Sequence, residues 1–182
     1  GFYRPHTPYV APKPYFKKYN VDEMPLVEGV EEDVKDLPQD ALGSHKKEHE
    51  LLNDDLRQQA IQAYFASITF MDAQVGRILE ALEKSGLREN TLIIFAGDNG
   101  LAVGQHGLLG KQNLYEHSIR VPMIIAGPGI PSNVKTNGFT YLSDIAPTVY
   151  AYLGIKAPAS VEAKSFFAVL KNPSKSIRKN IY

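Results

Sequence analysis

Apolar side chains recur every three or four residues between positions 55 and 84, whereas the flanking stretches lack this period. Such spacing places apolar residues on one face of an α-helix, so it predicts one long amphipathic helix of about 45 Å. Asp54 or Asp55 is expected to cap its start, and Gly86 to follow its end. The apolar stripe consists of Ile61, Tyr64, Phe65, Ile68, Met71, Val75, Ile78, Leu79 and Leu82.

Two short runs rich in isoleucine and other apolar residues predict buried strands, at 91–96 and at 121–127. The glycine-rich residues 101–118 between them are expected to form a loop. A second helix is expected at 142–154, with Ser143 or Asp144 near its start and Gly154 after its end. A long helix followed by strand, loop, strand and helix is typical of an α/β fold.

The first 54 residues lack a clear period. Prolines at positions 5, 8, 12 and 14 predict an extended loop over 1–20, and residues 21–54 read as a polar surface excursion. The chain starts with Gly1 and a segment rich in proline and aromatic residues, as in the middle of a domain. We therefore expect a piece of a longer protein.

Composition narrows the classes of partner. The 20 basic and 20 acidic residues cancel, which gives no reason to expect nucleic acid or an anionic membrane as the main partner. No apolar run reaches the ~18 residues of a membrane span. The absence of cysteine excludes disulfides, zinc–thiolate sites and a cysteine nucleophile within these 182 residues.

Asp98 and Asn99 stand between two glycines at the end of the first predicted strand. Ligands of α/β proteins bind beyond the carboxyl ends of strands, and a carboxylate beside an amide oxygen suits a hard cation such as Ca²⁺ or Mg²⁺. Two oxygens are too few for such a site. The local sequence by itself favours an ordinary Asp-Asn-Gly turn.

Three other residues are candidates for chemistry. Lys111 in a glycine-rich loop could hold an anionic group as a point charge, His106 could donate to an oxyanion, and the prolines around His6 could aim its imidazole. Each has a simpler interpretation: a solvated lysine, a loop histidine bonded to backbone, and a polar tip on a packed loop.

Four segments, taken together and in this order, resemble the sulfatase family, most closely the branch that contains iduronate-2-sulfatase. The resemblance runs from Gly1 to about Ile155. It implies part of an alkaline-phosphatase-like α/β sheet with flanking helices, and residues 1–182 would be the C-terminal portion of the catalytic domain. The segments are "RPHTPY", "YFASITFMDAQVGRILEALEKSGLRENTLIIFAGDNG", "GQHGLLGKQNLYEHSIRVPMIIAGPG" and "LSDIAPTVYAYLGI".

The resemblance also implies roles for the candidate residues. Sulfatases hydrolyse sulfate esters with a formylglycine nucleophile, made from Cys or Ser, beside a calcium ion. By the family pattern, Asp98 and Asn99 are calcium ligands, whereas Lys111 and His6 lie at the sulfate and His6 assists the leaving group. His106 falls in a recurrent "G.HG" segment and is placed near the substrate.

The sequence departs from the family pattern in its nucleophile. No serine has Pro two residues on and Arg four residues on, and the family's paired aspartates and its middle Lys and His are also missing. We therefore expect the isolated chain to be inactive, to bind Ca²⁺ weakly, and to need a missing N-terminal half as its partner. An export signal to the periplasm, cell exterior or lysosome would lie upstream.

Other functions stay open at this point. A phosphodiesterase, phosphonate hydrolase or phosphatase of the same superfamily would share the strand-end aspartate, usually with zinc or manganese and more histidines. A non-catalytic remnant or binding module would expose a large apolar surface and cover it in a homo-oligomer. Within the sulfatase interpretation, a sulfated sugar is the expected substrate.

Overall fold

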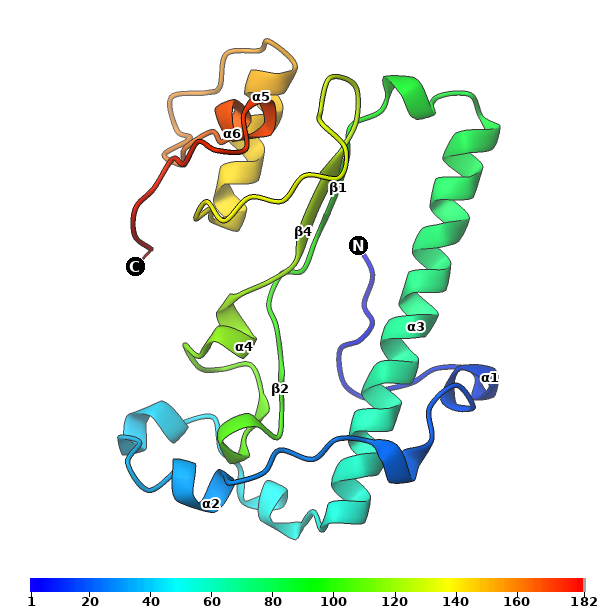
Figure 1. The fold of residues 1–182 in the computed structure, drawn as a ribbon, viewed down its shortest axis with the longest axis vertical. Helices are drawn as coiled ribbons and strands as arrows, with labels where there is room; N and C mark the ends of the chain where they lie inside the picture. The colour runs from blue at the N-terminus through cyan, green and yellow to red at the C-terminus, as the bar shows by residue number, and fades with distance from the viewer. Residues whose placement is uncertain (182) are drawn as a thin grey trace. The chain divides into compact units, whose positions relative to one another are not determined.

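The longest element is α3 (Asp54–Lys84), one helix of 31 residues, which confirms the helix predicted from the apolar period (Figure 1). The side chain of Asn53 caps it by accepting a hydrogen bond from the Leu56 amide at 2.9 Å. The expectation that Asp54 or Asp55 caps the helix is wrong, because both already lie in its first turn. Gly86 follows the helix with φ +71°, as expected.

The computed structural model describes residues 1–181, which form two units with separate sets of contacts. Unit 1 comprises residues 1–87 and 99–122, and unit 2 comprises 88–98 and the residues from 123 onwards. The described residues contain no helix that has both the length and the apolar character needed to cross a membrane.

Unit 1 is built around α3. Besides α3 it contains α1 (Lys13–Phe16), η1 (Val21–Glu23), α2 (Val30–Asp33), η2 (Gln39–Leu42), η3 (Lys47–Leu51), β2 (Ala102–Val103), η5 (Gln105–Gly107), β3 (Leu109–Gly110) and α4 (Glu116–Ile119). The short strands β2 and β3 pair antiparallel. The loop predicted at 101–118 therefore contains one small hairpin and two helical turns.

The N-terminal segment packs on the first half of α3. The Tyr15 ring meets the Phe70 ring edge-on, with centroids 5.2 Å apart. The amide of Gln62 donates a hydrogen bond to the Tyr19 carbonyl at 2.8 Å, and the Tyr19 hydroxyl bonds Thr69. These contacts hold the proline-rich start of the chain against the helix (Figure 1).

Unit 2 is built on a pair of strands. Strand β1 (Ile93–Ala96) pairs antiparallel with β4 (Met123–Ala126), with Ile93 opposite Ala126. Both strands lie inside the predicted ranges, but Ile124 is 62 % exposed, so β4 is less buried than its apolar sequence suggests. The remaining elements are η4 (Arg88–Asn90), η6 (Leu142–Asp144), α5 (Ile145–Tyr152) and α6 (Phe167–Lys171).

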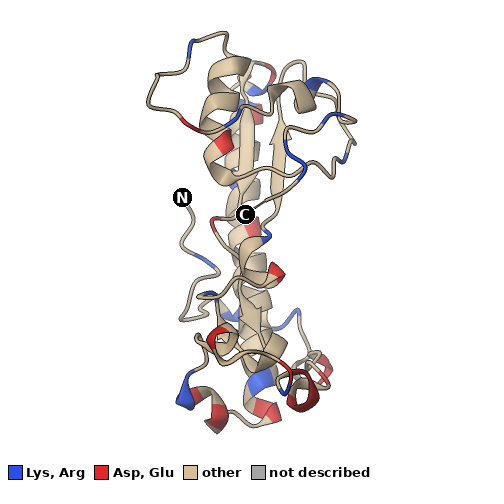
Figure 2. Cartoon of the chain, turned by 90° about the vertical axis from the view of Figure 1, so that its left-hand side faces the viewer, with Lys and Arg blue, Asp and Glu red and all other residues tan. Residues whose placement is uncertain are grey.

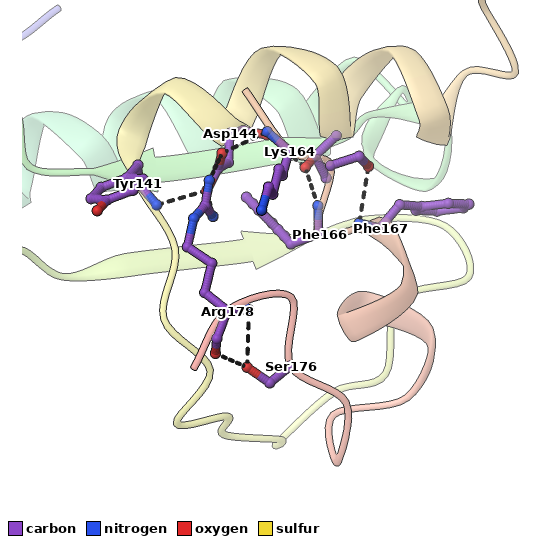
Figure 3. A network of polar contacts seen from close by, with 9 residues as sticks. Tyr141, Asp144, Lys164, Phe166, Phe167, Ser176 and Arg178 are labelled. Atoms are coloured by element: carbon purple, nitrogen blue, oxygen red, sulfur yellow. Dashed lines mark hydrogen bonds and ion pairs between the residues drawn. The ribbon is translucent and has the colours of Figure 1, made fainter. Parts of the chain in front are cut away.

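A polar network lies in the core of unit 2, where α5 begins (Figure 3). The Asp144 carboxylate is fully buried and accepts hydrogen bonds from the amides of Tyr141 and Lys164 and from both terminal nitrogens of Arg178. Thr148 is also buried and accepts a hydrogen bond from the Phe166 amide at 2.9 Å. Five donors from separate stretches of chain thus converge on the first turns of one short helix.

Candidate functional site

The predicted cation pair follows directly after β1. This strand ends at Ala96, and Asp98 is exposed to solvent, whereas Asn99 is half-buried. The chain leaves unit 2 at Asp98 and enters unit 1 at Asn99. The two predicted ligands are thus consecutive residues at the boundary between the units.

Lys111 lies beside Asn99. Its ammonium donates a hydrogen bond to Asn99 Oδ1 at 3.1 Å, and the Asn99 amide nitrogen donates to the Gly100 carbonyl at 2.8 Å. Lys111 is half-buried and follows β3 directly. The structure therefore brings together two predicted site residues that lie 12 positions apart.

Gly100 fixes the backbone next to this pair. Its amide donates a hydrogen bond to the Ser118 carbonyl at 2.8 Å. A Cβ atom at position 100 would lie 2.0 Å from the His117 carbonyl oxygen, which no real structure tolerates. This glycine is required for the close approach of two backbone segments within unit 1.

Replacing Gly100 by alanine is expected to destabilise unit 1 by about 2 kcal/mol, since the backbones must separate to admit one methyl group. Gly76→Ala is the matched control, because its Cβ meets no atom within 4 Å and it lies within α3. That control should stabilise the protein by about 0.5–1 kcal/mol. Denaturant unfolding measures the change in the free energy of unfolding for each variant, which should be negative for Gly100→Ala and positive for Gly76→Ala. Equal changes in the two variants would contradict the packing argument.

His106 has an unusual backbone and a defined partner. Its φ is +53°, in the left-handed region that non-glycine residues rarely adopt, between Gly104 at +123° and Gly107 at +67°. Its Nδ1 lies 2.7 Å from a carboxylate oxygen of Asp33, at the end of α2. Its ring stacks on Tyr115 with centroids 4.1 Å apart. The polar excursion thus orients a predicted site residue.

Sequence reasoning missed Tyr115 and His117, which adjoin His106. The His117 ring centroid lies 5.6 Å from that of Tyr115 and 5.7 Å from that of His106. Burial, together with the nearby His106, lowers the pKa of His117, because both disfavour the charged form of the ring. Among the described residues, neither His117 Nε2 nor the Tyr115 hydroxyl has a hydrogen-bond partner, although both atoms are buried. Only their closeness in sequence to Lys111 could have indicated them.

His6 is exposed on the N-terminal loop of unit 1. Its Nδ1 donates to the Thr7 carbonyl at 2.8 Å, and its ring lies 5.1 Å from that of Tyr3. Because Nδ1 is used locally, Nε2 is the nitrogen available to a ligand. In the part of the chain that the structure describes, no hydrogen bond or ring contact joins His6 to His106 or Lys111.

The arrangement offers a cation, the Lys111 ammonium, beside one oxygen donor, Asn99 Oδ1. The Lys111 ammonium can hold an anionic oxygen, and the oxygens of Asp98 and Asn99 are of the kind that hard cations prefer. Within residues 1–181, no group of three or more His, Cys, Asp or Glu side chains could hold a metal ion. Further ligands for a six- to eight-coordinate ion would have to come from other residues.

Comparisons with known proteins bear on this site. A family model described as Sulfatase matches residues 1–155. A sulfatase of Formosa agariphila is 30 % identical over 176 residues, which cover 94 % of this chain and 35 % of that protein. An N-acetylglucosamine-6-O-sulfatase of Bacteroides thetaiotaomicron is 33 % identical over 120 residues, which cover 65 % of this chain and 22 % of the relative.

A solved structure is also similar. Phosphonate monoester hydrolase from Silicibacter pomeroyi aligns with a TM-score of 0.84 and 26 % identity over 97 % of this chain and 37 % of its own. The chain therefore spans about a third of the length of this hydrolase and of the Formosa sulfatase. The predicted α/β fold of the sulfatase and alkaline phosphatase type is confirmed.

Proposed function

Because the chain belongs to the sulfatase family, we propose that it supplies part of the active site of an enzyme that hydrolyses sulfate esters. The sulfate esters of sugars are the proposed substrates, a choice supported by a relative named for N-acetylglucosamine 6-O-sulfate. The hydrogen bond between Lys111 and Asn99 carries the proposal, because it holds a positive charge beside the amide oxygen of the strand-end pair.

Lys111 and His6 have separate tasks in this proposal. Lys111 binds a non-bridging sulfate oxygen, so that its charge offsets the negative charge that these oxygens carry during sulfate transfer. His6, in its protonated form, gives the Nε2 proton to the leaving alkoxide when the ester S–O bond breaks. His106, held by Asp33, binds further oxygens of the substrate.

Asp98 and Asn99 are proposed to hold a calcium ion. The donor set fits in kind, since a carboxylate oxygen and an amide oxygen are ligands of the type that Ca²⁺ takes. When bound, the ion would supply Lewis-acid stabilisation of the sulfate charge. Asp98 and Asn99 account for only two ligands, so we expect this chain by itself to bind Ca²⁺ weakly, and a tight stoichiometric isotherm would contradict that.

The nucleophile has to come from residues other than these 182. No serine here has the spacing to Pro and Arg that the formylglycine precursor requires in this family, and cysteine is absent. We therefore expect the purified chain to release no 4-methylumbelliferone from its sulfate ester above the buffer rate. Co-expression of the chain with a nucleophile-bearing segment should produce release of 4-methylumbelliferone. Cys→Ala at the nucleophile of that segment should abolish the release. Robust turnover by the 182 residues alone would overturn this division of the site.

A phosphonate monoester hydrolase is the second candidate function. The observation that favours it is the TM-score of 0.84 to an enzyme of that name. Rates with phenyl phosphonate esters and aryl sulfates, measured on the same active preparation, separate the two. A preference for the phosphonate, together with two zinc ions per enzyme, would reverse the ranking.

A further inference from the structure

A basic pocket lies in unit 2, and none of the residues assigned a role above lines it. It has a volume of about 420 Å³ and is lined by residues 135–139 and by 173–176 with 178 and 179. The two loops are in contact, since a Cβ atom on Gly138 would lie 3.6 Å from the Lys175 carbonyl oxygen and 3.7 Å from Ser176 Oγ. A pocket of this size accommodates one sugar ring with its substituents.

The charge around this pocket is positive. Unit 2 carries eight Lys and Arg but only four Asp and Glu, although the whole chain is neutral. Figure 2 shows basic residues spread over the loops of this unit. The lining contains four cationic side chains and no carboxylate. The pocket is therefore selective by charge for an anion.

Three of the four cations are available to a ligand. The Arg178 guanidinium is committed to the buried Asp144 carboxylate, so its charge is already offset. Lys135, Lys175 and Lys179 are exposed, and none of them pairs with a carboxylate of the described residues. Because lysine side chains are flexible, these three ammonium groups can bind more than one sulfate group of the same ligand.

The pocket also has ordered walls. Asn172 Oδ1 accepts hydrogen bonds from the amide and hydroxyl of Ser174, which closes the turn before Lys175. The Ser176 hydroxyl donates to the Arg178 carbonyl at 2.6 Å, and Arg178 is anchored to Asp144 (Figure 3). The backbone that carries Lys175 and Lys179 is thus tied to the core of unit 2 through Arg178.

We propose that this pocket is an accessory binding site for sulfated polysaccharide, which holds the sulfate groups of sugar units not being hydrolysed. The half-exposed Phe139 in the lining offers an apolar ring face on which the C–H face of a sugar can pack. A nucleic acid is less well matched, because it binds through aromatic stacking of successive bases along a basic groove. The choice of a sulfated sugar rests on the proposed function.

The test is binding of a fluorescent heparin hexasaccharide to the full 182-residue chain, measured by anisotropy at several salt concentrations. The triple variant Lys135→Gln, Lys175→Gln and Lys179→Gln should bind about tenfold more weakly, because exposed ion pairs contribute roughly two- to fivefold each. The affinity of this triple variant for the hexasaccharide should also depend less steeply on salt concentration than that of the parent. The control Arg88→Gln, Lys156→Gln and Lys164→Gln removes the same charge from unit 2 outside the pocket and should bind as the parent does.

Two results would overturn the proposal. Equal weakening of hexasaccharide binding in both triple variants would mean that only net charge matters. A DNA 30-mer that binds as tightly as the hexasaccharide, and loses as much affinity when the three pocket lysines are replaced, would mean a general polyanion surface. The assay needs no turnover, so it is independent of the sulfatase test. If the chain co-expressed with a nucleophile-bearing segment hydrolyses no sulfate ester while the hexasaccharide binds through the three lysines, the proposed function fails and the pocket stands.

Discussion

Lys111→Ala is expected to lower kcat/KM for an aryl sulfate by about 10²–10³, in an active enzyme that contains this sequence and a nucleophile segment. Removal of one preorganised group that stabilises transition-state charge has this size of effect. The bond from Lys111 to Asn99 Oδ1 preorganises the ammonium before substrate arrives. Because the sulfate is already anionic in the ground state, both KM and kcat should worsen.

A charge-retaining variant tests whether the position of that charge matters. Lys111→Arg keeps the positive charge but delocalises it over a planar guanidinium, which cannot reproduce the compact contact of an ammonium. We therefore expect activity between that of the parent and that of Lys111→Ala. Lys84→Ala is the control, since Lys84 is exposed and pairs only with Glu80 on the surface of α3. Activity of Lys111→Ala within twofold of the parent, with an unchanged unfolding midpoint, would remove Lys111 from the site.

The parts of the fold that depend on local sequence could be predicted. Helix α3 follows from a 3.6-residue apolar period sustained over 31 residues, and its end from a glycine that tolerates φ +71°. Its cap was misassigned because Asn53, Asp54 and Asp55 are consecutive residues that can all cap, and only backbone geometry selects Asn53.

The parts of the candidate site that depend on distant contacts could not be predicted. Asp33 lies 73 positions from His106 in a segment that reads as a polar surface, so no periodicity links the two. The strand-end pair could be named as a candidate because its position after a strand is itself informative, and Lys111 because of the glycines around it. Gly100 makes room for the His117 backbone, a contact 17 positions away that the local sequence does not indicate.

Asp144 illustrates the same limit in unit 2. From the sequence it is a candidate helix cap, and it does directly precede α5, but its side chain makes no capping hydrogen bond to that helix. Its role as the acceptor for Arg178, 34 positions later, has no sequence signal. Asp144 is the fully buried carboxylate of this unit's described core and joins η6, residue 164 and the C-terminal segment.

Asp144→Ala is therefore expected to destabilise unit 2 by about 3 kcal/mol, because it removes one partner of a buried ion pair. Hydrogen exchange of the α5 amides measures this directly, and residues of α3 in unit 1 serve as an internal reference. Glu162→Ala is the matched control, because Glu162 is an exposed acid of the same unit. Equal exchange rates in the two variants would mean that the network contributes nothing to stability.

The pH dependence of stability gives an independent test of the same network. Burial raises the pKa of Asp144, but hydrogen bonds from Arg178 and from the amides of Tyr141 and Lys164 outweigh it, so the pKa lies below its usual 3.8. The unfolded chain then binds the proton more readily, and the stabilisation is complete above pH 3.8 and is lost as the pH falls through the folded pKa. Asp144→Asn cannot titrate, so the stability difference between parent and variant should be constant above that pH and shrink below it. A difference that stays constant down to pH 2 would show that the carboxylate is not the group that the network stabilises.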